Sequence, residues 1–148
     1  MSKEIRDSKA FNQTLQEVQK EVGSLQWLAL KTRLDIAAIT AICASMMSRN
    51  PWQALVWTQE VWKYLAHTRT LYTVVLPDQT HGVRIASDAS FAPGGDRSRT
   101  GAVILVSGVI VHWISQRQTE AAASAHEAEL TAAKMGSTVG LTIRRIVT

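Results

Sequence analysis

The sequence has few of the residues that cross-link a chain or anchor it in a membrane. It contains one cysteine, Cys43, in 148 residues, so an intramolecular disulfide is impossible and a cysteine-based zinc site is not expected. A single cysteine fits a reducing, intracellular compartment. No apolar run reaches the roughly 18 residues of a membrane span, because Lys31, Arg33 and Asp35 interrupt the best candidate. Residues 1–9 lack the apolar region of a signal peptide, and no membrane partner is expected.

Charge is also scarce and is spread evenly. Charged residues make up 19% of the chain, with 16 Lys and Arg against 12 Asp and Glu, for a net charge of +4. Residues 1–80 hold nine basic and seven acidic residues and residues 81–148 hold seven and five, so a basic tail is absent. This balance fits either mild solubilising charge or weak attraction to a polyanion such as nucleic acid, and composition does not choose between them.

The first half of the chain is predicted to be helical. Apolar residues recur at spacings of three and four over residues 12–30, 35–47 and 51–66. Asn50 is expected as the N-cap of the third helix and Pro51 as its first residue. Six side chains are expected to join the helices: Leu25, Leu28, Ile39, Ile42, Trp62 and Leu65. Four of the five tryptophans lie in this half. Such a stripe is typical of a core, and the alternative is a platform on which nucleic-acid bases stack.

The second half has the pattern of a small sheet followed by a helix. A loop at residues 77–82 follows a short strand at 71–76 and is predicted as the domain boundary. Three further strands are predicted, at residues 83–91, 100–106 and 109–116. Ser107-Gly108 is expected to form a tight hairpin turn. Ser124 and Glu127 form a capping box that begins a helix running toward residue 147. We therefore expect a mixed α/β (α+β) chain, with a helical segment over 1–80 and a second domain over 81–148.

Two carboxylates in this second domain are candidates for chemistry. Asp88 interrupts an apolar strand, where aspartate is disfavoured and an unpaired buried carboxylate is costly. Glu129 borders a helix face of small residues, whereas Glu127 is explained by the capping box. If Glu129 faces Asp88, the two like charges require a cation, and hard oxygen ligands select Mg²⁺ or Mn²⁺. The alternative is that Asp88 only marks the hydrated end of its strand.

The same residues carry a resemblance to a known family. Ser87-Asp88-Ala89-Ser90, the apolar run at 100–105 and the segment 129–133 look like the opening of a ribonuclease H domain. Residues 113–118 followed by 124–130 resemble that region of copia-type retrotransposon Pol polyproteins. Four upstream segments are similar to the helical connection between reverse transcriptase and ribonuclease H in these elements: residues 22–29, 32–37, 50–52 and 61–65.

The resemblance implies a ribonuclease H-like fold in which Asp88 sits on the central strand, faces the start of the last helix and shares metal ions with Glu129. In its complete form the family cleaves RNA in RNA–DNA hybrids by two-metal-ion hydrolysis with Mg²⁺ or Mn²⁺. Asp88 and Glu129 match its catalytic, metal-binding residues. Arg97, Arg99 and Arg117, expected in loops flanking the strands, are candidates to contact phosphates.

The family's remaining carboxylates, on a fourth strand and near the end of the domain, are expected to lie beyond residue 148. We therefore expect this chain to be an incomplete ribonuclease H-like domain that is inactive alone. Its expected partners are an RNA–DNA hybrid, the rest of the Pol polyprotein and, through the unpaired sheet edge, a second copy. The alternatives are a non-catalytic remnant or interaction module, and an unrelated helical interaction protein in which Asp88 and Glu129 lie far apart.

Overall fold

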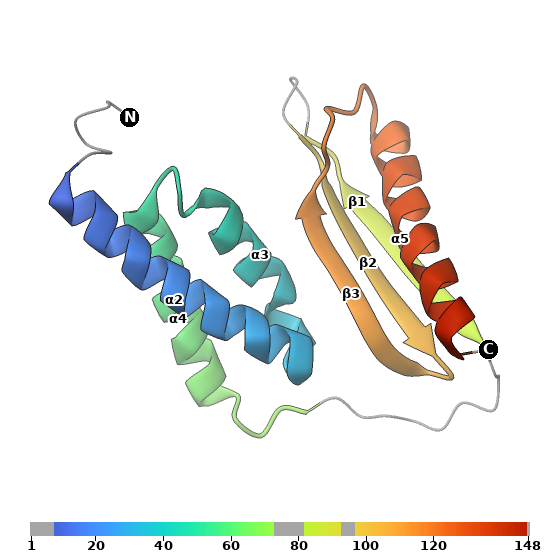
Figure 1. Cartoon of the computed structure of the whole chain (residues 1–148), viewed down its shortest axis with the longest axis horizontal. Coiled ribbons are helices and arrows are strands. Elements are labelled where there is room, and N and C mark those ends of the chain that lie inside the picture. Colours follow the sequence, from blue (N-terminus) through green and yellow to red (C-terminus); the bar gives the residue numbers. More distant parts are fainter. Residues whose placement is uncertain (1–7, 73–81, 93–96, 148) are drawn as a thin grey trace. The chain divides into compact units, whose positions relative to one another are not determined.

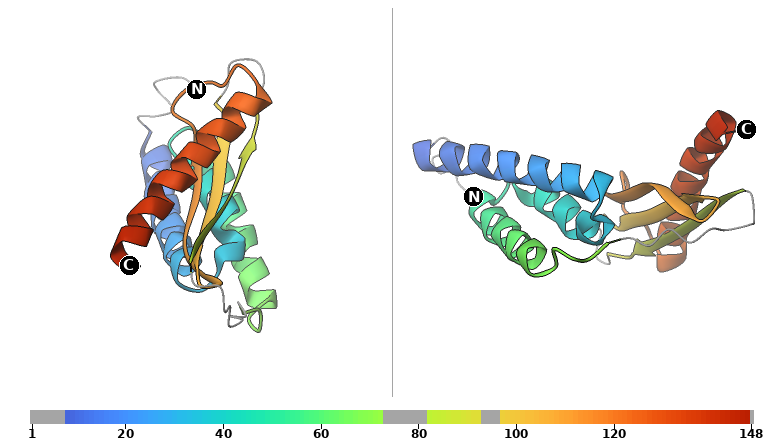
Figure 2. Two further views of the ribbon diagram at one scale, coloured as in Figure 1. Left: turned by 90° about the vertical axis from the view of Figure 1, so that its right-hand side faces the viewer. Right: turned by 90° about the horizontal axis from the view of Figure 1, so that it is seen from below.

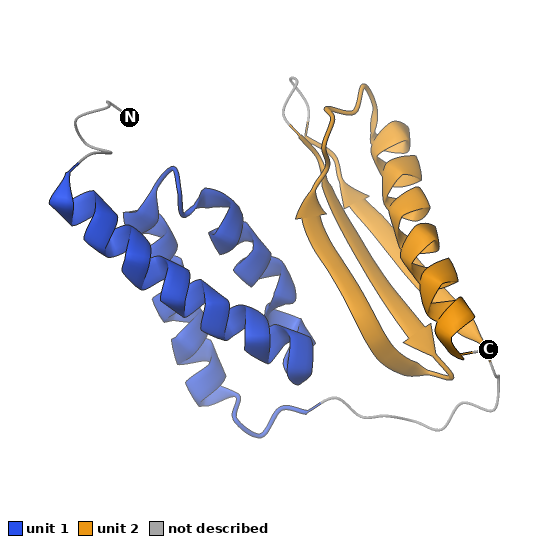
Figure 3. Ribbon diagram, viewed as in Figure 1, with its two compact units in different colours: residues 1–73 blue, residues 74–148 orange. Residues whose placement is uncertain are grey.

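The chain divides into two compact units, residues 1–73 and residues 74–148 (Figure 3). The computed structural model describes residues 8–72, 82–92 and 97–147. The strand predicted at 71–76, most of the loop predicted at 77–82 and the boundary between 80 and 81 therefore fall largely outside the described residues. Each unit is described here by itself.

Unit 1 is built from helices, as the spacing of its apolar residues predicts (Figure 1). They are α2 (Lys9–Lys31), the short 3₁₀ helix η1 (Leu34–Ile36), α3 (Ala37–Met46) and α4 (Pro51–His67). The Ser8 hydroxyl caps α2 by accepting from the Phe11 N–H at 3.2 Å. Asn50 caps α4 by accepting from the Gln53 N–H at 3.2 Å, with Pro51 as the first helical residue, as predicted.

One buried cluster in unit 1 is made of small side chains. Val18 and Val22 of α2 pack with Cys43 of α3 and Ala54 of α4. The six side chains predicted to join the helices are all buried or half-buried, with Leu25 fully buried. Burial raises the pKa of the Cys43 thiol above its ordinary value, so this cysteine is a small packed group rather than a reactive one.

A polar network closes one end of unit 1. Arg33 follows α2 and is largely buried, and its guanidinium makes two hydrogen bonds to the Asp35 carboxylate, at 2.9 and 3.0 Å. The same guanidinium donates to the carbonyl and the hydroxyl of Thr68 at the end of α4, and Tyr64 donates its hydroxyl to Asp35 at 2.9 Å. Asp35 lies in the first turn of η1, and through Arg33 and Tyr64 it also links the end of α2 to α4.

Unit 2 contains a three-stranded antiparallel sheet of order β1-β2-β3 (Figure 1). The strands are β1 (Val83–Ser90), β2 (Arg99–Val106) and β3 (Val109–Arg117). Ser107 and Gly108 both have positive φ, 48° and 81°, which is the conformation of a type I′ hairpin turn and confirms the predicted turn. Among the described residues β1 pairs only with β2, so it is an edge strand.

Helix α5 (Ala125–Val147) lies across one face of this sheet, over β1 and β2 (Figure 2). Its buried residues are spaced four apart and are all small: Ala128, Ala132, Gly136 and Gly140. A side chain at Gly136 would come within 3.0 Å of the Ile85 side chain, so glycine permits the close approach of helix and strand. Ala125, three residues before the first of these, is exposed, because the buried ridge follows the four-residue spacing.

Candidate metal site at the edge of the sheet

Asp88 lies near the end of the edge strand β1, not on a central strand as predicted. Its partner in the register is Gly101 of β2, which is the middle strand of the described sheet. Asp88 is exposed, and among the described residues its carboxylate has no hydrogen-bond or ion-pair partner. Asp88 was a candidate because an unpaired buried carboxylate is costly. Since its carboxylate is exposed, that cost does not arise.

The face on which Asp88 lies also differs from the prediction. A side chain at Gly136 of α5 would lie within 4 Å of the side chains of Ile85 and Ser87, so these strand residues face the helix. Successive strand residues point to opposite faces, which places Asp88 on the face away from α5. The prediction that Asp88 faces the start of the last helix is therefore wrong as stated.

Glu129 lies on the side of α5 that overlooks β1. It is seven residues before Gly136, which puts the two within about 20° of each other around the helix. Gly136 and Gly140 both adjoin β1. Met135 lies on the β3 side of the helix, because its sulfur accepts a hydrogen bond from the Gln116 amide of β3 at 3.1 Å. Glu129 is exposed and, among the described residues, has no hydrogen-bond or ion-pair partner.

The contacts of two glycines give the direction in which α5 runs over β1. Gly140 adjoins Val83 and Ile85, and Gly136 adjoins Ile85 and Ser87, so α5 runs antiparallel to β1. Glu129 lies seven residues, or about 10 Å, nearer the start of the helix than Gly136. There the Ala128 carbonyl accepts from Gln118, which also donates to Thr100 of β2. Glu129 is therefore on the helix side of the sheet, and Asp88 is on the opposite face.

The start of α5 is fixed by two sets of hydrogen bonds. One half of the predicted capping box is present, with the Glu127 N–H donating to the Ser124 hydroxyl at 3.2 Å. The Glu127 carboxylate accepts from the Ala123 N–H rather than from the cap residue itself. Gln118, a buried residue after β3, donates its side-chain amide to the Thr100 hydroxyl at 3.2 Å and to the Ala128 carbonyl at 2.8 Å. Gln118 therefore positions the helical turn that carries Glu129, which the sequence did not indicate.

The predicted phosphate-contacting arginines are only partly in loops. Arg97 precedes β2 and is exposed, but Arg99 is the first residue of β2 and Arg117 the last residue of β3. Arg99 and Arg117 are direct cross-strand partners. Partial burial, and then the neighbouring positive charge of Arg117, lower the pKa of Arg99 below its ordinary value. Two arginines side by side make this corner of the sheet positive.

The donor chemistry of Asp88 and Glu129 fits one magnesium ion. Both are oxygen donors without a competing partner in the described part of the chain, and Mg²⁺ is commonly held by one or two carboxylates together with waters and substrate phosphates. The described residues contain no group of three or more His, Cys, Asp or Glu side chains able to hold a metal. A pair of ions would need further ligands.

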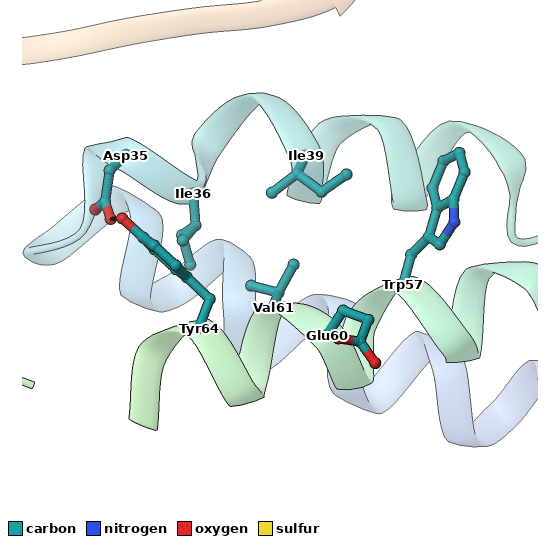
Figure 4. A pocket seen from close by; sticks show the side chains of 7 residues that line it. All are labelled: Asp35, Ile36, Ile39, Trp57, Glu60, Val61 and Tyr64. Carbon is teal, nitrogen blue, oxygen red and sulfur yellow. Dashed lines mark hydrogen bonds between the residues drawn. The ribbon is translucent and has the colours of Figure 1, made fainter. Parts of the chain in front are cut away.

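Unit 1 contains a separate pocket, between η1, α3 and α4 (Figure 4). Its volume is about 300 Å³, and its inner surface is formed by Ile36, Ile39 and Val61 between the rings of Trp57 and Tyr64. Both carboxylates at its rim have partners: Asp35 binds Arg33 and Tyr64, and Glu60 binds Lys63 at 2.6 Å. The pocket is apolar and has no unengaged acid or base.

Comparison of the chain with family models, curated proteins and solved structures gives no match. Over the described ranges, none of the helices combines the length and the apolar character needed to cross a bilayer.

Proposed function

We propose that residues 82–147 form the opening part of a ribonuclease H-like domain and that residues 8–72 are the helical connection that precedes it in copia-type retrotransposon Pol polyproteins. The observation that supports the proposal is that Asp88 lies on the edge strand β1 and that α5, the helix carrying Glu129, packs against β1 and β2. The antiparallel meander followed by a long helix packed through small residues is the order of elements that the resemblance implies.

In this proposal the two carboxylates hold Mg²⁺ or Mn²⁺ at the β1 edge, and a bound metal would lower the pKa of a coordinated water and stabilise charge on the leaving oxygen. Asp88 supplies oxygen ligands from the open face and Glu129 supplies them from α5. Gln118 acts as a positioning residue, because it fixes the turn before Glu129. Arg99 and Arg117 add positive charge toward an RNA–DNA hybrid.

Mn²⁺ titration of the ¹⁵N-labelled chain tests the shared ion directly. Paramagnetic broadening is expected at the amides around Asp88 and Glu129 at the same Mn²⁺ concentration. Asp88→Asn should relieve the broadening at both places, since one ion bridges them. Glu120→Gln is the control: it removes an exposed acid between β3 and α5 and should relieve the broadening at neither place. Independent broadening, with the Glu129 region unaffected by Asp88→Asn, would refute the shared ion.

Cleavage of a labelled RNA–DNA hybrid is expected to stay at background with Mg²⁺ or Mn²⁺. Phosphoryl transfer depends mostly on positioning, and the described residues place no third acidic group with these two carboxylates to help hold a metal pair. Cleavage that disappears in Asp88→Asn would show that this ligand count is wrong, while supporting the assignment of Asp88 itself.

An interaction module is the second candidate. It is favoured by the number of large apolar side chains exposed on unit 1, among them Trp27 at 61% and Tyr72 at 78%. If Mn²⁺ binds neither carboxylate while the chain binds a macromolecule through unit 1, this second function replaces the first.

A further inference from the structure

Unit 1 has an open groove between α2 and α4 whose walls are tryptophans. The groove has a volume of about 600 Å³, and it is lined by Gln19, Lys20, Gly23, Ser24, Trp27, Leu28 and Trp62. Trp27 is 61% exposed, although exposing a ring of this size forgoes the burial that would stabilise the unit. Trp62 is half-buried and donates its indole N–H to the Glu21 carboxylate, which fixes the orientation of that ring.

Gly23 is a glycine that the fold of unit 1 does not require. It lies in the interior of the 23-residue helix α2, where glycine is less favourable than alanine. A side chain at this position would meet no atom within 4 Å, so no close helix contact demands glycine here. By contrast, Gly136 and Gly140 of α5 lie against strand residues. Because Gly23 has no side chain, the groove stays open at this position.

The lining of the groove is complementary to a flat ring attached to a negatively charged group. Gly23 lies between Lys20, three residues before it, and Trp27, four residues after it, so all three lie on one side of α2. Lys20 is the one formally charged residue in the lining, and the nearby Glu21 is engaged by Trp62. The described part of unit 1 has seven Lys and Arg against four Asp and Glu. Base stacking on an aromatic ring beside a positive charge is the usual chemistry of single-stranded nucleic-acid binding.

We propose that this groove binds a nucleotide base of a single-stranded nucleic acid, stacked against Trp27 over Gly23, with Lys20 beside the phosphate. The inference concerns unit 1 alone and does not depend on Asp88 or Glu129. It therefore stands or falls separately from the ribonuclease H-like assignment.

Fluorescence anisotropy with a labelled twelve-nucleotide oligo(dT) and the full chain tests the proposal. Trp27→Ala removes the stacking ring, and Gly23→Leu adds a side chain to the groove at a position where a Cβ meets no atom within 4 Å. Each is expected to raise Kd about tenfold, the size of one lost base–aromatic stack. Trp57→Ala is the matched control, because Trp57 is also exposed on unit 1 but does not line the groove, and its Kd should change less than about twofold.

Two further arms identify what is bound. An abasic oligonucleotide of the same length should bind more weakly by a similar factor, whereas equal affinity would show a purely electrostatic contact and refute the stacking proposal. If dTMP competes with similar affinity, the groove recognises the same base and phosphate in a free nucleotide, and the proposed chemistry is supported. If Gly23→Leu and Trp27→Ala both bind like the wild type, or no oligonucleotide or nucleotide binds at low salt, the proposal is wrong and a protein partner is the alternative occupant.

Discussion

The two long helices provide a matched test of how closely each one packs. Gly23 lies within α2 and Gly140 within α5, and each helix has 23 residues. Replacing either glycine by alanine gains about 1 kcal/mol of helix propensity. At Gly23 the new methyl group would meet no atom within 4 Å, so the whole gain should appear as stability of unit 1.

At Gly140 the same substitution should have the opposite sign. The new methyl group would overlap the end of the Ile85 side chain and would lie 2.8 Å from its Cγ1 atom. Ile85 must then change rotamer or α5 must move outward, and such overpacking costs about 1–3 kcal/mol. After the gain in propensity is subtracted, Gly140→Ala should destabilise unit 2 by about 1 kcal/mol.

Hydrogen exchange on peptides from α2 and α5 measures each unit separately. Gly23→Ala is expected to slow exchange in α2 about fivefold, and Gly140→Ala to speed exchange in α5 about fivefold, because 1 kcal/mol corresponds to that factor. If Gly140→Ala slows exchange in α5 as much as Gly23→Ala slows it in α2, then α5 does not approach Ile85 closely, and the assignment of Asp88 to the opposite face of the sheet loses its basis.

Two other substitutions test the polar networks. Asp35→Asn should lower the unfolding free energy of unit 1 by about 1.5 kcal/mol at neutral pH, since Arg33 loses a charged acceptor. The hydrogen bonds from Arg33 hold the pKa of Asp35 below its ordinary value. That stability is therefore present above the unfolded pKa of about 3.9 and is lost as pH falls through the lower folded pKa, so urea titrations of variant and wild type should converge in acid. A difference that is constant with pH would contradict this. Gln118→Leu should destabilise unit 2 by about 1–3 kcal/mol, because Thr100 and the Ala128 carbonyl lose a buried donor. The exposed Gln116→Leu should change stability by less than about 0.5 kcal/mol, and equal losses in the two variants would refute the positioning role of Gln118.

Local signals predicted most of the secondary structure. The caps at Asn50 and Ser124 and the turn at Ser107-Gly108 depend on residues close in sequence, so their geometry follows from side-chain chemistry alone. The expected helix over 35–47 is the exception, since it begins as the 3₁₀ turn η1. There Arg33 bonds both Asp35 and Thr68. Thr68 lies 35 residues after Arg33, so the spacing of apolar residues does not predict this contact.

The candidate site was harder to predict because it depends on which face of the sheet the helix covers. A shift of one residue along a strand moves a side chain to the other face, so the apolar run around Asp88 could not assign its direction. The small residues at 128, 132, 136 and 140 decide that Ile85 and Ser87 face α5. Arg99 and Arg117 were likewise predicted as loop residues because they lie at strand ends, where boundaries depend on pairing with the neighbouring strand.

The edge position of β1 decides what Asp88 and Glu129 can do together. Within a sheet covered on both sides, carboxylates on opposite faces would be separated by a layer of backbone. Among the described residues no strand pairs with the outer edge of β1, so in the proposed site each carboxylate would approach an ion beside β1 from its own face. Because both are exposed, binding an ion there removes little solvent and gains little from a low dielectric, so the affinity of the pair alone should be weak. A further strand or a substrate phosphate beside β1 would exclude water and add oxygen ligands at the same place. For this reason the decisive property is whether the two carboxylates share one ion, rather than how tightly they hold it.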